Sequence, residues 1–370
     1  MTTTTATPWT LGTVPVPASL DDDDAWALRG EVELERLVER DLRGHDDLAY
    51  SVQETLVALR DQRYVARTHL VVTHPDRPRD VVGALHLRAP QLGDTHLVEC
   101  GLLVHPDHRR RGVGTLLLAA AERHTRDLGR RLLLVASDHG PEPDADDPDA
   151  VTPPTGSGRI RRTDPFARLA ARGGLVLQQS ERYSVLDLPV DPGHLARLRA
   201  DAQDAAGPDY RVVTWQDRYP GQWVDQIAVL VTRMSTDVPR GAVEATEDPW
   251  DARRLLDAAA DTRASGRGWL GAAALHVPTG TLVGFTEVEY PLHAPTVVFQ
   301  EDTLVLREHR GHRLGQLVKA ANLQRLAEVR PTARRVHTWN AEENSYMLRI
   351  NVALGFRPAG VSGLWTKPVG

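Results

Sequence analysis

The sequence predicts a mixed α/β protein made of two tandem domains related by internal duplication. Its 370 residues exceed the roughly 250 to 300 at which a single hydrophobic core usually stops growing. The segment DVVGALHL at 80–87 resembles TLVGFTEV at 281–288, and LLVHPDHRRRGVG at 102–114 resembles TLVLREHRGHRLG at 303–315. Both pairs are 201 residues apart, and this constant offset indicates that one unit is written twice.

Each predicted domain has the same order of elements: two helices, a strand, a hairpin, a strand, a glycine turn with a helix, a further strand, and a final helix with a terminal strand. A segment rich in Pro, Asp and Gly, 138–159, is predicted to be a mobile loop of the first domain. We place the first domain at 1–190, a linker with a short helix at 191–207, and the second domain at 208–370. In the first domain the predicted helices are 25–42 and 50–61, the hairpin turn is 74–80, the late strand is 132–137 and the closing turn is 173–175. In the second domain the helices are 221–234 and 249–264, the hairpin turn is 276–281, the late strand is 336–339 and the closing turn is 354–356.

Composition and charge exclude several classes of protein. A hydrophobic content of 41% and a charged content of 25% are typical of a globular protein, so disorder and fibrous structure are not expected. The net charge of −6 gives no electrostatic reason to bind nucleic acid, and no apolar run is long enough to suggest a membrane span. One cysteine, Cys100, permits no intramolecular disulfide or cysteine zinc site. Because the opening MTTTTATPWTLG lacks the features of a signal peptide, we expect a cytoplasmic protein.

A predicted anion site lies at Arg109–Gly114, between a strand and the Ala/Leu-rich helix that comes after it. Small residues let the backbone approach a pyrophosphate, whose oxygens can accept hydrogen bonds from the unpaired N–H groups of a helix N-terminus. Flanking arginines add charge-assisted contacts. The segment lacks G-K-[ST] and a third glycine, so a Walker loop and a dinucleotide fingerprint are both excluded.

Val104 followed after four residues by R-x-x-G-x-G resembles the acyl-CoA signature of the GNAT superfamily. The second copy, Arg310–Gly315, carries Arg313 where the first glycine of that signature stands. The resemblance implies two GNAT-fold domains that bind acetyl-CoA as acyl donor, in a tandem arrangement similar to that of actinobacterial double-GNAT proteins such as mycothiol synthase. The residues expected to bind the donor are Leu103, Val104, Arg109, Arg110, Arg111, Gly112, Val113, Gly114 and Thr115, and Leu304, Val305, Arg310, Gly311, His312, Arg313, Leu314, Gly315, Gln316, Asn340 and Asn344.

The segment from Asn340 to Phe356 resembles a second GNAT motif, N-x-x-A-x-x-x-Y-x-x-x-G-F. The resemblance implies that Asn344 contacts the pantetheine arm. It also implies that the residue seven positions later protonates the departing thiolate, but Asn351 occupies that position and cannot supply a proton. The first domain has Ala170 four residues before Gly174 and no asparagine there, so CoA binding without catalysis is expected in that half.

The family mechanism implies that pantetheine lies between the fourth and fifth strands and that an amine attacks the thioester directly. A backbone N–H near Val305 or Val104 would stabilise the oxyanion. The candidate bases of the second domain lie on its third and fourth strands, and alternation predicts that Glu301 and Asp302 face opposite sides of the sheet. These candidates are Glu287, Glu289, Glu301 and Asp302, and the first domain offers Glu99 on the matching strand.

Histidines near the two loops are predicted to be solvated, and no metal is expected; they are His105, His108, His309 and His312. Cys100 is expected in the core, and 237–244 to line the acceptor cleft. The sequence therefore predicts a monomeric or homodimeric N-acetyltransferase that moves an acetyl group from acetyl-CoA to a small-molecule primary amine, with the second domain catalytic. The alternatives are a non-catalytic acyl-CoA sensor and a protein-lysine or N-terminal acetyltransferase.

Overall fold

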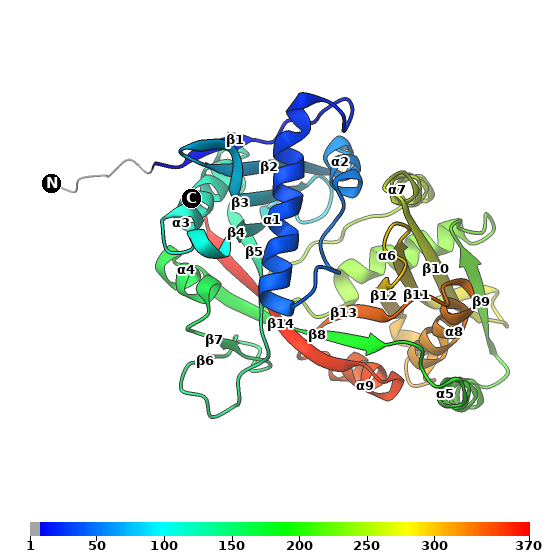
Figure 1. Ribbon diagram of the computed structural model, residues 1–370. Helices are drawn as coiled ribbons and strands as arrows, with labels where there is room; N and C mark the ends of the chain where they lie inside the picture. The colour runs from blue at the N-terminus through cyan, green and yellow to red at the C-terminus, as the bar shows by residue number, and fades with distance from the viewer. Residues whose placement is uncertain (1–7) are drawn as a thin grey trace. The chain divides into compact units, whose positions relative to one another are not determined.

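The computed structural model describes residues 8–370 and divides them into two compact units (Figure 1). Unit 1 contains residues up to Ser180 together with Val361–Gly370, and unit 2 contains Glu181–Gly360. Both units combine helices with a mixed sheet, as the sequence predicts. Residues 1–7 of the opening segment and of the first predicted domain lie outside the described residues. None of the helices in the described part of the chain has the length and apolar character that crossing a membrane requires.

Unit 1 has the strand order β1-β2-β3-β4-β5-β14, in which only β4 and β5 pair in parallel. Its elements are β1 (Thr10–Thr13), η1 (Asp23–Ala25), α1 (Trp26–Arg43), α2 (Val52–Arg60), β2 (Val65–His74), β3 (Arg77–Pro90), β4 (Leu97–Val104), η2 (Pro106–His108), α3 (Val113–Asp127), β5 (Leu132–His139), β6 (Ala150–Val151), β7 (Ile160–Arg161), α4 (Pro165–Gly173), the start of β8 (Val176–Asp187) and residues 361–368 of β14 (Arg357–Pro368).

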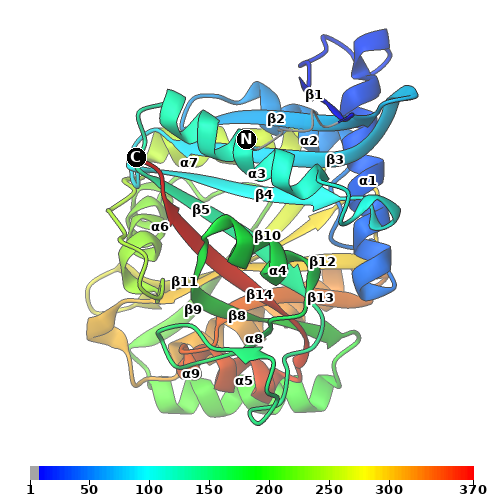
Figure 2. The same ribbon diagram turned by 90° about the vertical axis from the view of Figure 1, so that its left-hand side faces the viewer.

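Helices cover both faces of the unit 1 sheet because neighbouring strand residues point to opposite sides. Leu85 of β3 packs with Leu117 of α3, whereas the adjacent Ala84 packs with Leu28 of α1. Figure 2 shows α3 lying in front of β3 and β4. A capping box at Ser51 begins α2 and fixes where that helix starts against the sheet.

Unit 2 repeats this plan with the strand order β8-β13-β12-β11-β10-β9 and a parallel pairing of β12 with β13. Its elements are the end of β8, α5 (Pro192–Ala206), β9 (Tyr210–Gln216), α6 (Val224–Asp237), α7 (Ala252–Ala264), β10 (Arg267–His276), β11 (Thr281–Pro291), β12 (Val297–Val305), η3 (Arg307–His309), α8 (Leu314–Val329), β13 (Arg335–Ala341), α9 (Ser345–Leu354) and the start of β14.

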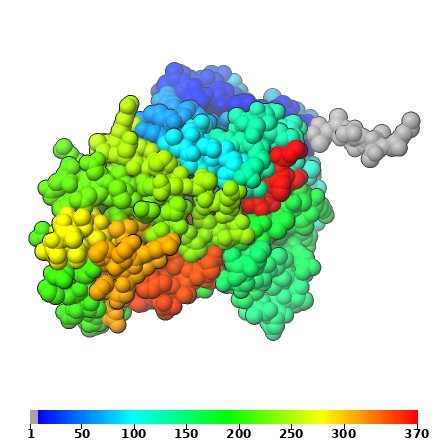
Figure 3. Space-filling model, turned by 180° about the vertical axis from the view of Figure 1, so that it is seen from behind, coloured from blue at the N-terminus to red at the C-terminus, as the bar shows by residue number. Residues whose placement is uncertain are grey.

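The two final strands of the sequence repeats are exchanged between the packing units. Residues 181–187 of β8 pair with β13 in unit 2, and residues 361–368 of β14 pair with β5 in unit 1. In Figure 3 the last residues, in red, lie against the teal and green residues of unit 1. The units defined by packing therefore do not coincide with the division at 191–207, and the helix predicted there, α5, packs on α8 of unit 2.

The predicted irregular loop at 138–159 contains more regular structure than expected. β5 continues to His139, and the short strands β6 and β7 pair as Ala150↔Arg161 and Val151↔Ile160. The side chain of Ile160 is fully buried in the core of unit 1. One apolar residue beyond the Pro- and Asp-rich segment thus anchors its end, which the composition of 138–159 alone does not reveal.

Candidate functional site

The two predicted phosphate loops have the same backbone conformation. Arg110 and Gly112 have φ of 60° and 90°, and the residues 201 positions later, Gly311 and Arg313, have φ of 93° and 53°. Gly and Arg have exchanged places between the two left-handed positions of the loop. The departure from the signature at Arg313 therefore leaves the loop shape intact, although a non-glycine residue is strained in this region.

Each loop ends at the N-terminus of a long helix that has no side-chain cap. Gly112 precedes α3 and Arg313 precedes α8, and neither position makes a side-chain capping hydrogen bond. The first N–H groups of both helices are thus free of side-chain acceptors, which is the arrangement that binds an anion. The side chains of Val113 and Leu314 are buried, so these predicted binding residues can face a ligand only through their backbone.

Acidic residues hold the first arginine of each loop in place. Arg109 Nη1 lies 2.8 Å from Asp41 Oδ2 at the end of α1, and Arg310 Nη2 lies 3.5 Å from Asp237 Oδ2 at the end of α6. Arg310 Nε also donates to the carbonyl of Val305 at 3.1 Å. Both guanidinium groups are partly exposed beside the helix N-termini, where they can approach a phosphate.

The second glycine of each loop packs closely against a neighbouring helix. A Cβ at Gly114 would lie 3.1 Å from Leu169 of α4, and one at Gly315 would lie 3.1 Å from Ile350 of α9. Gly112, in contrast, has open space around it and is required by its positive φ. The signature glycines therefore serve two different physical needs.

The remaining predicted donor-binding residues lie on the same two strand-loop-helix connections or after β13. Leu103 and Val104 end β4, Leu304 and Val305 end β12, and Thr115 and Gln316 lie in the first turns of α3 and α8. The Gln316 side chain donates to the carbonyl of Leu198. The others, Arg111, Gly311 and His312, lie in the two loops.

A pocket of about 200 Å³ opens in unit 2 where β12 and β13 separate. The two strands pair only from Val297↔Arg335 to Phe299↔His337, and their later residues diverge. This is the position predicted for the pantetheine arm. The lining residues come from β8, β12, β13, the surrounding helices and the segment after α6; they are Glu181, Met234, Val238, Pro239, Glu301, Asp302, Thr303, Lys319, Thr338, Trp339, Asn340, Ala341, Asn344 and Met347.

Glu301 and Asp302, which strand alternation places on opposite sides of the sheet, both line this pocket. Thr286 pairs with Thr303 and Val288 with Gln300, which leaves one residue of β11, Glu287, opposite two residues of β12. This bulge interrupts the alternation on which the prediction rested. It also gathers three carboxylates at the point where the strands begin to diverge.

The carboxylates of this cluster resist ionisation. Burial, followed by repulsion from Asp302 and Glu289, raises the pKa of Glu287 to about 8, although Trp215 Nε1 and Tyr219 OH both donate to it at 3.3 Å. Burial raises the pKa of Asp302 to about 6. Loss of water contacts and repulsion from Glu289 and Asp302 also raise the pKa of Glu301. Asp302 is therefore the member that ionises most readily near neutral pH.

Lys319 is the functional candidate that sequence analysis missed. Its side chain is 1% exposed, lines the pocket, and lies with Nζ 5.7 Å from the centre of the Phe356 ring. No hydrogen bond or ion pair joins it to another residue among 8–370, and burial lowers its pKa to about 7. The sequence offered a signal: the chain has only two lysines, Lys319 and Lys367, and this one lies on the buried side of an otherwise Leu/Ala-rich helix face.

The three asparagines after β13 occupy different places. Asn340 and Asn344 line the pocket, and the Asn344 side chain also caps α9 by accepting from the backbone N–H of Met347. Asn351 is 2% exposed and is not a lining residue; its Nδ2 donates to Asn340 Oδ1 at 2.6 Å. Asn351 thus does not line the pocket; it binds the side chain of Asn340, which does.

The corresponding region of unit 1 is built differently. β3 and β4 pair without a bulge from Gly83↔Val104 to Arg88↔Glu99, and β4 stays paired with β5 over five positions, from Leu97↔Leu132 to Gly101↔Ala136. Burial raises the pKa of Cys100 to about 12, in keeping with a core residue.

In unit 1, a row of acidic side chains comes from α1, which carries no sequence motif that would indicate it. They are Glu31, Glu35 and Glu39, spaced by one helical turn. Burial raises the pKa values of Glu35 and Glu39 to about 7. Glu99, the carboxylate expected from the matching strand, faces Arg88 at 3.8 Å.

The loop histidines pack against aromatic rings beside the loops. The His108 ring contacts the rings of Trp9, His74 and His105. His309 shares a hydrogen bond of 2.8 Å with Tyr210 OH, and its ring contacts that of His276. Within residues 8–370, none of these rings belongs to a group with the spacing of metal ligands.

Comparison with known proteins identifies the fold. Residues 33–141 match the acetyltransferase (GNAT) family. A tandem GNAT protein from the clavulanic acid biosynthesis pathway superposes with a TM-score of 0.72 at 26% identity, covering 98% of this chain and 99% of that one. A GCN5-related N-acetyltransferase from Sphaerobacter thermophilus superposes with a TM-score of 0.61 at 16% identity, covering 98% and 96%. No curated protein matches the chain. Residues 33–141 thus resemble the GNAT family, and the duplicated loop and the divergent parallel strands agree with the fold of a tandem GNAT protein over nearly the whole chain.

Proposed function

We propose that unit 2 transfers an acetyl group from acetyl-CoA to the primary amine of a small molecule, by direct attack within a ternary complex. The observation that carries this proposal is the pocket between β12 and β13, which brings a carboxylate, an unpaired lysine and two asparagines together. The uncapped N-terminus of α8 lies at the end of the same strand β12, through the loop 306–313. One donor molecule can thus be held at its pyrophosphate by the loop and at its thioester by the pocket.

The donor arm is recognised by groups that the strands leave unpaired. Pantetheine amides extend the hydrogen bonding of β12 and β13 where these strands no longer bond each other, as an added strand does. Asn340 and Asn344 bind the arm from the side of α9. Asn351 acts as a positioning residue, because its hydrogen bond fixes the amide of Asn340.

Asp302 accepts the proton of the attacking amine. Its pKa of about 6 leaves it ionised at neutral pH, whereas the pKa of Glu287, about 8, keeps that group mostly protonated. The amine nitrogen forms a bond to the thioester carbonyl carbon and loses its proton to Asp302. The resulting oxyanion is stabilised by the backbone N–H near Val305. We therefore propose that Glu287 and Glu301 influence the ionisation of Asp302 and do not contact the reacting atoms.

Lys319 returns a proton to the leaving group. When the C–S bond breaks, the CoA thiolate takes a proton from the Lys319 ammonium, and the amide product remains. An amine with a pKa of about 7 is well matched to a thiol, whose ordinary pKa is about 8.5. Lys319 thereby fills the role that the family assigns to the tyrosine replaced here by Asn351.

The charge of the pocket defines the class of acceptor. Glu181, Glu301 and Asp302 line it, and Lys319 is the only basic residue that the described part of the chain, 8–370, contributes to the lining. Such a pocket favours an acceptor that arrives as a compact ammonium ion and disfavours an acidic one. The ammonium ion gives one proton to solvent before it attacks as the neutral amine, and the proton lost during attack goes to Asp302. In unit 1, the α3 loop binds a CoA pyrophosphate, and that unit has a structural or regulatory role.

A panel of small primary amines with acetyl-CoA, followed by detection of free thiol, tests this function. We expect thiol release that depends on the amine and an acetylated product seen by mass spectrometry. Asp302→Asn and Lys319→Met should each lower kcat at least tenfold, whereas Lys367→Met, the matched control at the other lysine, should not. Equal rates with and without amine across the panel, or full activity in both pocket variants, would contradict the proposal.

A further inference from the structure

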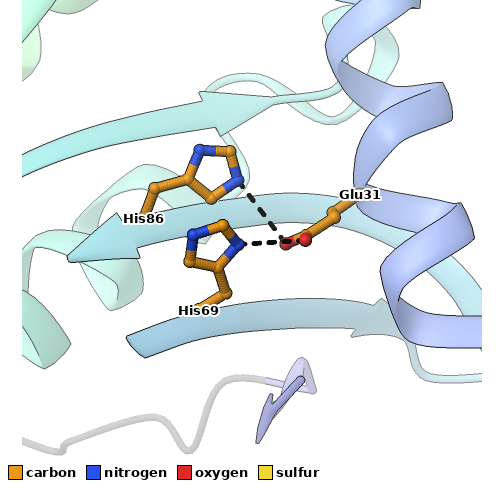
Figure 4. A group of neighbouring side chains, drawn as sticks. All are labelled: Glu31, His69 and His86. Carbon is orange, nitrogen blue, oxygen red and sulfur yellow. Dashed lines mark hydrogen bonds and ion pairs between the residues drawn. The ribbon is translucent and has the colours of Figure 1, made fainter. Parts of the chain in front are cut away.

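Two histidines and a glutamate converge on the α1 side of the unit 1 sheet (Figure 4). His69 of β2 and His86 of β3 are directly paired across the two strands, and their rings stack at 4.2 Å between centroids. Glu31 reaches them from α1: its Oε1 lies 3.0 Å from His69 Nδ1, and its Oε2 lies 3.5 Å from His86 Nε2. Strand register and helix packing, rather than a flexible loop, therefore hold the three groups together.

This group is incompletely satisfied as a hydrogen-bonded cluster. Glu31 is 1% exposed, yet its Oε2 has no hydrogen-bond partner, and the same is true of His86 Nε2. These two atoms form an ion pair at 3.5 Å without hydrogen-bond geometry, whereas buried polar atoms in native proteins nearly always make hydrogen bonds. A cation between them would bind both atoms.

We propose that Glu31, His69 and His86 form a binding site for a divalent transition metal ion, with Zn²⁺ as the best fit. The three donor atoms lie within 4.8 Å of one another. Tetrahedral coordination with Zn–N and Zn–O distances of ~2.1 Å separates ligands by about 3.4 Å, so small side-chain movements complete the site. Two imidazoles with one carboxylate select zinc and its neighbours over Mg²⁺ and Ca²⁺, which prefer oxygen ligands.

The surrounding charges favour a cation in the same place. The Glu31 carboxylate lies against both rings, at 3.0 Å from His69 Nδ1 and 3.5 Å from His86 Nε2. Glu35, one turn along α1, places a further carboxyl group close to His86. Three protein ligands leave a fourth position open to water or to a bound small molecule, which is the pattern of a catalytic rather than a structural zinc site.

This inference goes beyond the proposed function, because it concerns unit 1 and requires no turnover. At the offset of 201, position 86 corresponds to Glu287, so the metal site occupies the place that a carboxylate has in unit 2. It also departs from the expectation of no metal, which considered only the histidines of the two loops.

The test uses the full chain without a histidine tag, stripped with a chelator and dialysed. Calorimetric titration with ZnCl₂ gives stoichiometry and affinity, and titration with Co²⁺ gives visible d–d bands whose intensity reports four-coordinate geometry. The variants Glu31→Gln, His69→Gln and His86→Gln keep side-chain size. The matched control is His108→Gln, which removes a histidine from a ring cluster that has no buried carboxylate. Circular dichroism checks that each variant is folded.

We expect one tight ion per chain, intense Co²⁺ bands, and at least a tenfold loss of affinity in each of the three variants but not in His108→Gln. The Co²⁺ spectrum of the unaltered protein decides the matter even if Glu31→Gln fails to fold. Zinc binding that is equal in His86→Gln and the unaltered protein, or Co²⁺ bands as weak as those of the hexaaquo ion, would overturn the proposal.

Discussion

Replacing Lys319 by Met should make the protein more stable and less active at the same time. Met has nearly the volume of Lys without its charge, so the pocket keeps its packing while the buried amine is removed. The pKa of this amine falls from 10.5 to about 7, and at about 1.4 kcal/mol for each pH unit the difference corresponds to about 5 kcal/mol. This value is the upper limit of the gain in the free energy of unfolding of unit 2.

The gain depends on pH in a defined direction. Between about 7 and 10.5, the unfolded chain holds a proton on Lys319 that the folded protein does not, so the unaltered protein becomes more stable as the pH rises. Below about 7 both states are protonated and the full penalty is present; above 10.5 it disappears. The advantage of Lys319→Met should therefore be largest at pH 6 and shrink steadily towards pH 10.

Urea unfolding, with hydrogen exchange of the α8 amides as the local measure of unit 2, gives the stability at each pH. Loss of a general acid costs about 10²- to 10⁴-fold, so kcat should fall by at least tenfold, and the fall should disappear when the leaving thiol is made more acidic. Lys367→Met removes an ion pair with Glu122 at 2.6 Å and should change stability by at most about 1 kcal/mol at any pH. A Lys319→Met protein that is less stable at pH 6, or equally active, would refute the reasoning.

The loops and the carboxylates lead to further predictions. The kcat of the unaltered protein should rise as the pH passes about 6, where Asp302 ionises, and Asp302→Asn should remove this acidic limb; an unchanged pH profile in Asp302→Asn would exclude it as the base. Gly112→Val should weaken binding of CoA to unit 1 in calorimetry, because a β-branched residue is strained at φ 90°; unchanged stoichiometry and affinity would mean that this loop binds no CoA. Arg313→Gly should relieve the strain of φ 53° and stabilise the protein by up to about 1 kcal/mol in urea unfolding, a gain that Arg111→Gly, at a position without positive φ, should not give. Asn351→Ala should raise KM for acetyl-CoA more than it lowers kcat, because Asn351 acts through Asn340; loss of turnover with an unchanged KM would reverse this assignment.

Features that repeat along the chain, or that depend on short-range chemistry, could be predicted from the sequence. The offset of 201 located both loops, and the structure gives the corresponding residues of each the same left-handed conformations. The placement of Glu301 beside Asp302 in one pocket could not be predicted, since a bulge depends on register between strands and not on the alternation within one strand. Lys319 and the Glu31 group were missed for a related reason: their partners come from elements far apart in the sequence, with no motif to connect them.

The exchange of the last strands has a consequence for the order in which the chain can fold during synthesis. Unit 2, which comes second in the sequence, is one continuous segment, 181–360. Unit 1 begins first but lacks the neighbour of β5 until residues 361–368 have been made. Throughout translation of unit 2, the ribosome-bound chain therefore presents an open edge of β5, a template for mispairing with other chains. A nonsense codon near residue 360 would thus damage the N-terminal unit, and a cell that expresses such a truncated chain should accumulate aggregates rather than a working half.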